Sequence, residues 1–334
     1  MDAERIALYE DIEQARNSKV LVYFTGDRRG LETKMASEVL DLFVHHLDTI
    51  KVVDKISLIL YTRGGETLSA WSLANLLRTF CDELEIIIPA KCHSAGTLLC
   101  LGADNLVMTK QATLGPIDPS VTTPLNPQLP GGEPAARVPV SVEDVTAFLE
   151  QAREALGHEP IAQIFESLTQ EVHPLVLGHT YRIRSQIRML GRRLLSNHMD
   201  RQEDIEKILD FLCSESGSHD YTVYRREARE LLGLPIETPS WEFYYLIKEL
   251  YDNIAEDLEL TTPFDVNSFL GSQDRASYTF RRALIESVSG GSHIYVSEGE
   301  VVRQRVEVQP GFIGDAIGDQ RQFEGWRFHE AEDA

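Results

Sequence analysis

Apolar and polar positions in the first third of the chain follow two alternating patterns. Short runs rich in β-branched and aromatic residues, typical of buried strands, occur at residues 19–24, 56–61, 84–90 and 106–108. Apolar residues at helical spacing occupy residues 4–17, 31–47, 70–80 and 94–101. Strands and helices that alternate in this way predict parallel strands in an α/β layer with right-handed connections.

The pattern changes after residue 118. Residues 119–139 contain six prolines, which predicts a surface loop rather than regular structure. Ser141 followed by Glu143 and Asp144 predicts a capped helix start, and helical patterning then continues to about residue 213. This middle part is therefore predicted to be mostly helical.

The final third predicts two more helices and a small β extension. The helices are expected at residues 224–232 and 241–258, and the strands at 282–288, 293–297 and 301–308, the first two joined as a hairpin. We divide the chain into an α/β core at 1–125, a helical insertion that also completes the core at 126–235, and a C-terminal helix with a β-hairpin extension at 236–334.

Composition excludes several classes of function. The 334 residues include 32 basic and 53 acidic ones, and a net charge of -21 would repel a nucleic-acid backbone. No apolar run approaches the ~20 residues that span a bilayer, and the N-terminal segment lacks the layout of a signal peptide. The 4 cysteines have no metal-ligand spacing and indicate a reducing compartment. We expect a cytoplasmic protein with no metal, cofactor, nucleic-acid or membrane partner.

Two strand-to-helix turns carry candidate chemistry. Ser94 lies between an apolar strand and a helical run, and the pair Gly64-Gly65 lies at the end of the preceding strand. Open α/β sheets build their sites at the carboxyl ends of parallel strands. Backbone N–H groups of Gly65 and Ala95 would form a two-donor oxyanion hole beside the Ser94 hydroxyl. An ordinary N-cap serine and a tight glycine turn are the simpler alternatives.

These motifs resemble a known family. The stretches that carry the resemblance are Arg63-Gly64-Gly65, Ser94-Ala95-Gly96-Thr97, Leu101-Gly102-Ala103-Asp104, Leu114-Gly115-Pro116-Ile117-Asp118-Pro119, His173-Pro174-Leu175 and His219-Asp220-Tyr221. They are similar to the Clp-fold serine peptidases, in particular the serine dehydrogenase proteinases, which are related to signal peptide peptidase A. The resemblance implies a ClpP/crotonase-like spiral of ββα units, peptide-bond hydrolysis through an acyl-enzyme, and oligomerisation.

The resemblance also implies roles for individual residues. Ser94 matches the nucleophile, Gly65 the glycine of the oxyanion hole and Ala95 the second donor, with Gly64 and Gly96 in the supporting loops. The histidine of the Clp peptidase has no counterpart at the matching position, where Ile117 and Asp118 stand. No lysine lies between Lys110 and Lys207, and Arg188, in the analogous helix, stays protonated and cannot act as a base.

We therefore predict a rearranged triad. Ser94 attacks, His219 accepts its proton, and Asp118 orients the imidazole, since triads are defined by geometry rather than by chain order. His173 is the alternative base, with Asp220 as the alternative orienting carboxylate. Histidine suits the role because its pKa lies near neutral pH.

Two other functions stay open. One is a catalytically silent scaffold that binds peptides or partners, and the other is a crotonase-type enzyme acting on acyl-CoA. An α/β-hydrolase is disfavoured because Cys92 stands where its nucleophile motif requires a glycine. The expected partners are a peptide or protein substrate, further copies of the chain, and an adaptor that docks on the C-terminal extension.

Overall fold

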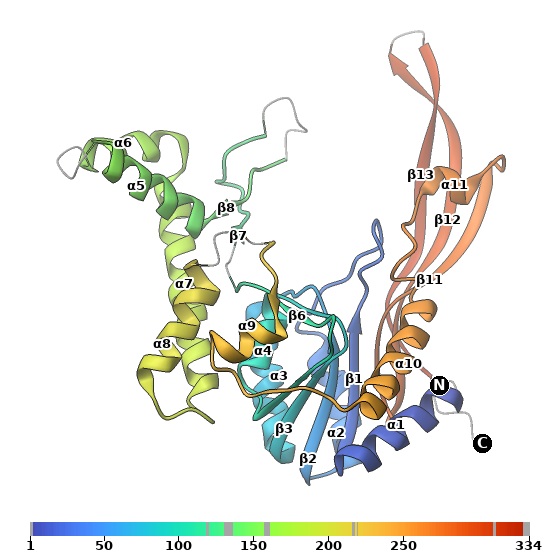
Figure 1. The fold of residues 1–334 in the computed structure, drawn as a ribbon. Helices are drawn as coiled ribbons and strands as arrows, with labels where there is room; N and C mark the ends of the chain where they lie inside the picture. The colour runs from blue at the N-terminus through green and yellow to red at the C-terminus, as the bar shows by residue number, and fades with distance from the viewer. Residues whose placement is uncertain are drawn as a thin grey trace. The chain divides into compact units, whose positions relative to one another are not determined.

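The computed structural model describes residues 3–117, 120–129, 136–156, 161–215, 218, 220–309 and 312–329. The chain divides into two compact units, one formed by Met1–Leu114 with Tyr224–Ala334 and the other by Gly115–Val223. Figure 1 colours both units by residue number. The three-part division proposed from the sequence stays a prediction.

An eight-stranded mixed sheet organises the first unit, with strand order β10-β5-β3-β2-β1-β11-β12-β13. Its parallel strands are β1 (Lys19–Thr25), β2 (Val53–Tyr61), β3 (Cys81–Ile88), β5 (Asn105–Met108) and β10 (Ile236–Glu237). Its antiparallel extension consists of β11 (Arg275–Ser287), β12 (Gly291–Gln309) and β13 (Phe312–His329) (Figure 1). The α/β class predicted from the patterning is thereby confirmed.

One face of the sheet is covered by α1 (Ala3–Arg16) and α10 (Trp241–Asp257), which lie side by side in Figure 1. Side chains alternate between the faces of a strand, so Val20, Val22 and Phe24 of β1 share one side. They join a buried apolar cluster with Tyr9 of α1 and Leu250 of α10. Burial on both faces explains why residues 20–24 of β1 are all apolar.

The opposite face is covered by α2 (Val39–Ile50) and α3 (Thr67–Phe80), with Tyr23 of β1 meeting Phe43 of α2 edge-on at 5.5 Å between ring centroids. The predicted helix at 31–47 is wrong over its first eight residues. There Met35 forms a parallel bridge with Gly65, and its N–H donates to the Gly64 carbonyl at 2.9 Å. Pairing with a distant segment has overridden the local helical pattern.

The C-terminal extension contains longer strands than the sequence indicates. The predicted third strand at 301–308 is wrong as a separate element, because β12 runs without a turn from Gly291 to Gln309. Its register shifts between Glu298 and Gly299, a β-bulge where the sequence pattern indicated a break. A Cβ on Gly299 would lie 2.6 Å from the Gln320 carbonyl oxygen, which explains the glycine. The third strand is β13.

The second unit is mainly helical. Its elements are β7 (Ser120–Val121), β8 (Val140–Ser141), α5 (Val142–Leu156), α6 (Ile161–Glu171), α7 (Pro174–Leu195), α8 (Gln202–Asp210) and a π-helical turn, η1 (Phe211–Glu215). Ser141 accepts a hydrogen bond from the Asp144 N–H at 2.9 Å, which confirms the predicted cap. Arg188 of α7 forms ion pairs with Glu206 at 3.0 Å and Asp210 at 2.7 Å.

The remaining short elements are β4 (Lys91–Cys92), α4 (Ala95–Cys100), β6 (Thr113–Leu114), β9 (Val223–Tyr224), α9 (Arg225–Glu230) and α11 (Val266–Leu270). None of the helices in the described residues combines the length and the apolar character that crossing a bilayer requires.

Candidate active site

The turn that carries Ser94 is fixed by β4, a two-residue strand that pairs with β6 and with the end of β2. The Thr62 N–H donates to the Lys91 carbonyl, and the His93 N–H donates to the Thr62 carbonyl, both at 3.0 Å. The helix α4 begins directly after Ser94. The serine is therefore held between a paired strand and a helix, as the sequence predicts.

Ser94 has a backbone conformation that is rare for a residue with a side chain, φ 52° and ψ -116°. Such a conformation costs on the order of 1–3 kcal/mol and is found mostly at functional sites. A serine on a sharp strand-to-helix turn is the arrangement that exposes the nucleophilic hydroxyl in α/β-hydrolases. The Ser94 hydroxyl forms no hydrogen bond with any residue that the structure describes.

Gly64 brings the second turn against the serine. Its φ is +110°, and a Cβ added to it would lie 2.7 Å from the Ser94 Cβ and 2.9 Å from the His93 carbonyl oxygen. A side chain would thus collide with the Ser94 turn. The Gly64 N–H is held by the Thr62 hydroxyl at 2.9 Å, so this amide is occupied.

The amides of Gly65 and Ala95 are the two candidate oxyanion donors. Within the described ranges, neither N–H donates to an acceptor, whereas the neighbouring Glu66 N–H binds the Met35 carbonyl at 2.9 Å. A Cβ on Gly65 would lie 2.1 Å from that Met35 oxygen, so only glycine fits. Unused backbone donors on two adjoining turns are the groups that stabilise an oxyanion.

Two further residues of the Ser94 stretch have packing roles. Gly96 lets α4 approach β2, because a Cβ there would lie 2.4 Å from Cγ2 of Thr62. His93 places Nε2 2.9 Å from the Thr113 hydroxyl of β6. Burial raises the pKa of the Cys92 thiol, so this neighbour stays protonated and is a poor nucleophile.

The predicted bases and orienting carboxylates belong to the second unit or lie outside the described residues. Asp118 and His219 fall in the latter group. His173 is exposed and caps α7, where its Nδ1 accepts the Leu175 N–H at 3.2 Å. Asp220 is exposed, and its N–H donates to the Ser218 hydroxyl at 3.2 Å. The identity of the general base and of its orienting carboxylate stays a prediction.

A charged cluster near the two turns was not predicted from the sequence. Asp27, two residues past β1, accepts hydrogen bonds from the Tyr61 hydroxyl at 3.0 Å and the Lys91 ammonium at 2.5 Å. Its other oxygen lies 3.3 Å from the Arg63 guanidinium. The members are far apart along the chain, so only the position of Asp27 at a strand end could have indicated the cluster.

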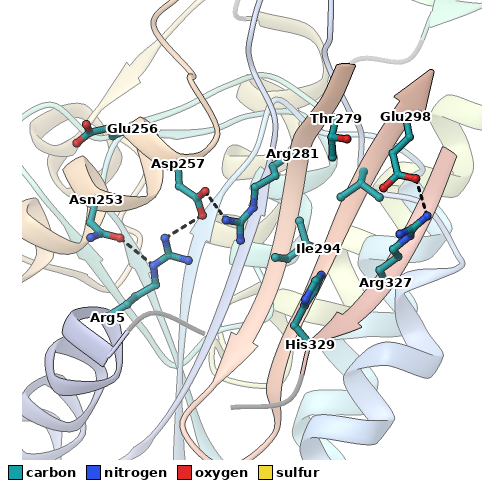
Figure 2. Close-up of a pocket in the computed structure, with 11 residues that line it drawn as sticks. Arg5, Asn253, Glu256, Asp257, Thr279, Arg281, Ile294, Glu298, Arg327 and His329 are labelled. Carbon is teal, nitrogen blue, oxygen red and sulfur yellow. Dashed lines mark hydrogen bonds and ion pairs between the residues drawn. The ribbon is translucent and has the colours of Figure 1, made fainter. Parts of the chain in front are cut away.

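A cavity of about 600 Å³ lies against β11, β12 and β13 in the first unit (Figure 2). Its charged lining balances three arginines against three carboxylates, Arg5, Arg281, Arg327, Glu256, Asp257 and Glu298. Ion pairs join these groups, including Arg5–Asp257 at 2.9 Å and Arg281–Asp257 at 2.8 Å. No serine or cysteine is among the residues that line it. Thr279 is the one hydroxyl side chain among them.

An α/β sheet with a strained serine turn beside a glycine-rich turn is the arrangement expected of ClpP-type serine peptidases. Residues 46–131, which contain both turns, match the family described as ClpP-like SDH-type serine proteinase. The resemblance predicted from the motifs is confirmed over this segment, and it supports a serine peptidase. Within the described residues, no group of three or more His, Cys, Asp or Glu side chains is arranged to hold a metal ion.

Two curated proteins of Methanocaldococcus jannaschii are similar in sequence. The uncharacterized protein MJ0137 is 29% identical over 196 residues, which cover 59% of this chain and 58% of that protein. The uncharacterized protein MJ1495 is 26% identical over 196 residues, covering 59% of this chain and 56% of that protein. The chain thus spans little more than half the length of these relatives.

Solved structures with a similar arrangement include two proteases. A serine-to-alanine mutant of the membrane-bound stomatin-specific protease 1510-N has a TM-score of 0.38 and 12% identity, over 63% of this chain and 77% of that chain. An asparagine-to-aspartate mutant of ClpP1 from Listeria monocytogenes has a TM-score of 0.35 and 11% identity, over 70% of this chain and 99% of that chain.

Proposed function

We propose that this protein is a serine peptidase that cleaves peptide bonds through an acyl-enzyme on Ser94. The observation that carries the proposal is the pairing of two turns. A serine with φ 52° and no hydrogen-bonded partner among the described residues lies against Gly64, and two unused amides, Gly65 and Ala95, flank it. The family match over residues 46–131 supports the same chemistry.

In this reaction the Ser94 hydroxyl gives its proton to the base as Oγ bonds to the carbonyl carbon of the substrate. The carbonyl oxygen becomes an oxyanion, which the N–H groups of Gly65 and Ala95 bind. The base then protonates the leaving amine as the C–N bond breaks. Water, deprotonated by the same base, cleaves the acyl ester and regenerates Ser94. Each oxyanion donor contributes on the order of 3 kcal/mol to transition-state binding.

We propose His219 as the general base and Asp118 as the carboxylate that orients it. The capping contact of His173 supports this choice, because Nδ1 of a neutral imidazole that accepts the Leu175 N–H leaves the proton on Nε2. A ring in that tautomer has no free acceptor for a serine proton. His173 with Asp220 is the alternative that the experiment below separates.

We also propose a cytoplasmic homo-oligomer without a cofactor, which acts on peptide or protein substrates. The four cysteines are buried and form no disulfide with one another, which supports a reducing compartment. The position of β13 at the edge of the large sheet supports docking of an adaptor on the C-terminal extension, because an edge strand offers unpaired backbone groups to a partner.

Fluorophosphonate labelling tests the proposal. The wild type should be labelled between about pH 6 and 9, where a histidine base is at least partly neutral, and Ser94→Ala should not. Ser185→Ala, which removes an exposed hydroxyl from α7, is the matched control and should label like the wild type. Labelling should be lost in His219→Ala and kept in His173→Ala. A folded wild type that stays unlabelled, or a Ser94→Ala variant that still labels, would overturn the proposal.

A further inference from the structure

The cluster around Asp27 lines a cavity of about 630 Å³ in the first unit. The cavity lies where strands end: Asp27 follows β1, Arg63 follows β2, and Lys91 opens β4. Arg63 directly precedes Gly64, and Lys91 stands three residues before Ser94. Two residues that line the cavity are therefore close in sequence to the two turns of the proposed active site.

The charges of this cavity do not cancel. Its charged lining residues are three cations and two carboxylates, Arg29, Arg63, Lys91, Asp27 and Glu32. The resulting local charge of +1 stands out in a chain with a net charge of -21. Two of the cations share the single carboxylate of Asp27, and a single negative charge cannot neutralise both.

The two cations that pair with Asp27 are also accessible to solvent. The side chains of Lys91 and Arg63 are 48% and 55% exposed, while that of Asp27 is 8% exposed. The buried carboxylate of Asp27 therefore pairs with two cations whose side chains are still open to solvent. The exposed Arg29 forms no ion pair with a residue that the structure describes.

We propose that this cavity binds a carboxylate of the peptide substrate between Lys91 and Arg63, with Arg29 at its rim. The inference rests on the proposed peptidase function and names its substrate class: peptides with a free C-terminal carboxylate or an acidic side chain near the bond that is cleaved. Guanidinium and ammonium groups make strong charge-assisted hydrogen bonds to carboxylates. The rings of Tyr61 and Tyr251 line the same cavity and provide apolar surface for the carbon chain.

Binding to the Ser94→Ala protein tests the subsite without any turnover. The probes are four alanine-rich hexapeptides: one with a free C-terminal carboxylate, its C-terminal amide, and two amidated versions with a central glutamate or glutamine. Calorimetry at low salt should give a dissociation constant about tenfold lower for a carboxylate peptide than for its neutral twin, the effect of one charge-assisted hydrogen bond. The pair that shows the difference identifies the carboxylate as terminal or side-chain.

Charge-removing variants then locate the effect. Lys91→Met and Arg63→Met should each abolish the preference for the carboxylate peptide. Lys248→Met is the matched control, since Lys248 is 43% exposed and also pairs with one carboxylate, Asp252. It should keep the preference.

The inference is overturned if carboxylate and neutral peptides bind equally, if none of the four binds at millimolar concentration, or if Lys91→Met keeps the preference. Failure of the peptidase proposal gives a different signature. In that case the wild type resists fluorophosphonate, while the carboxylate preference and its loss in Lys91→Met persist.

Discussion

Two regions of the first unit, the buried contacts of Glu286 and the turns of Ser94 and Gly65, differ in how far their polar groups are hydrogen-bonded. Arg5, which lines the cavity in Figure 2, also contacts the fully buried Glu286. The Glu286 oxygens accept hydrogen bonds from Arg5 at 3.0 and 3.1 Å, from Tyr9 at 2.5 Å and from Ser292 at 2.7 Å. At the paired turns, the Ser94 hydroxyl and the Gly65 amide have no partner among the described residues.

The difference separates stability from function. A buried carboxylate is tolerated only when its lone pairs are satisfied, so the Glu286 cluster holds α1, β11 and β12 together. Strain and unused donors reduce stability, and they persist where the surrounding structure holds them for a ligand or a transition state. We therefore expect substitutions at Glu286 to alter stability and substitutions at the turns to alter reactivity.

The largest effect on stability is expected for Glu286→Gln. It removes the fully buried one of the two carboxylates that pair with Arg5 and leaves Asp257 as the countercharge. Breaking a buried ion pair in this way costs up to about 3–5 kcal/mol. Urea unfolding followed by circular dichroism measures the loss. Glu298→Gln, at the rim, is the control and should cost under about 1 kcal/mol because its pair with Arg327 is partly exposed. Equal losses in the two variants would contradict the comparison.

Gly65→Ala should lower the rate at which fluorophosphonate labels Ser94. The added Cβ would lie 2.1 Å from the Met35 carbonyl oxygen, so the turn and its amide must shift. Loss of one oxyanion donor typically lowers the rate about 10²- to 10³-fold. The second-order rate of fluorophosphonate labelling, corrected for the folded fraction, measures the change. In Gly178→Ala nothing lies within 4 Å of the new Cβ, and labelling should equal that of the wild type. An unchanged rate in Gly65→Ala would remove this glycine from the proposed site.

The buried histidines His46 and His293, whose rings are 3.0 Å apart between Nε2 and Nδ1, make stability depend on pH. Burial, with smaller contributions from His293 and His45, lowers the pKa of His46 to about 3. The folded state therefore binds fewer protons than the unfolded state between about pH 3 and 6.5, and stability falls as the pH drops through this window. The slope due to His46 is up to about 1.4 kcal/mol per pH unit. Burial also lowers the pKa of His293 to about 4, so it acts in the same direction.

His46→Gln isolates this contribution. The variant cannot take up the proton, so the stability difference between wild type and variant should shrink from pH 6.5 toward pH 4. Urea midpoints measured across that range check the prediction. Parallel pH profiles would show that His46 is not kept neutral by folding.

The smallest effect is expected on the surface of the second unit. The Arg192 side chain is 41% exposed and lies 2.6 Å from Glu206. Exposed pairs of this kind contribute about 0–1 kcal/mol, so Arg192→Ala should change the free energy of unfolding by less than about 1 kcal/mol, and less still at high salt. A loss above about 2 kcal/mol would mean that this pair is part of the packed structure.

The sequence predicts those features that depend on neighbouring residues. Residues 20–24 are apolar without interruption and lie in β1, and the strand-turn-helix pattern places Ser94 correctly. Features made by distant segments could not be predicted. Met35 pairs with Gly65 instead of lying in a helix, and β12 continues through Gly299, opposite a bulge in β13. Asp27 gathers Arg63 and Lys91 from other strands.

Locating the fluorophosphonate adduct tests the central claim most directly. Wild type and Ser94→Ala, matched in melting temperature, would be treated with the probe, digested and analysed by mass spectrometry. The account predicts one adduct, on the peptide that contains Ser94, and none in the variant. An adduct on another residue, or no adduct on folded protein across about pH 6 to 9, would contradict the assignment of Ser94 as the nucleophile.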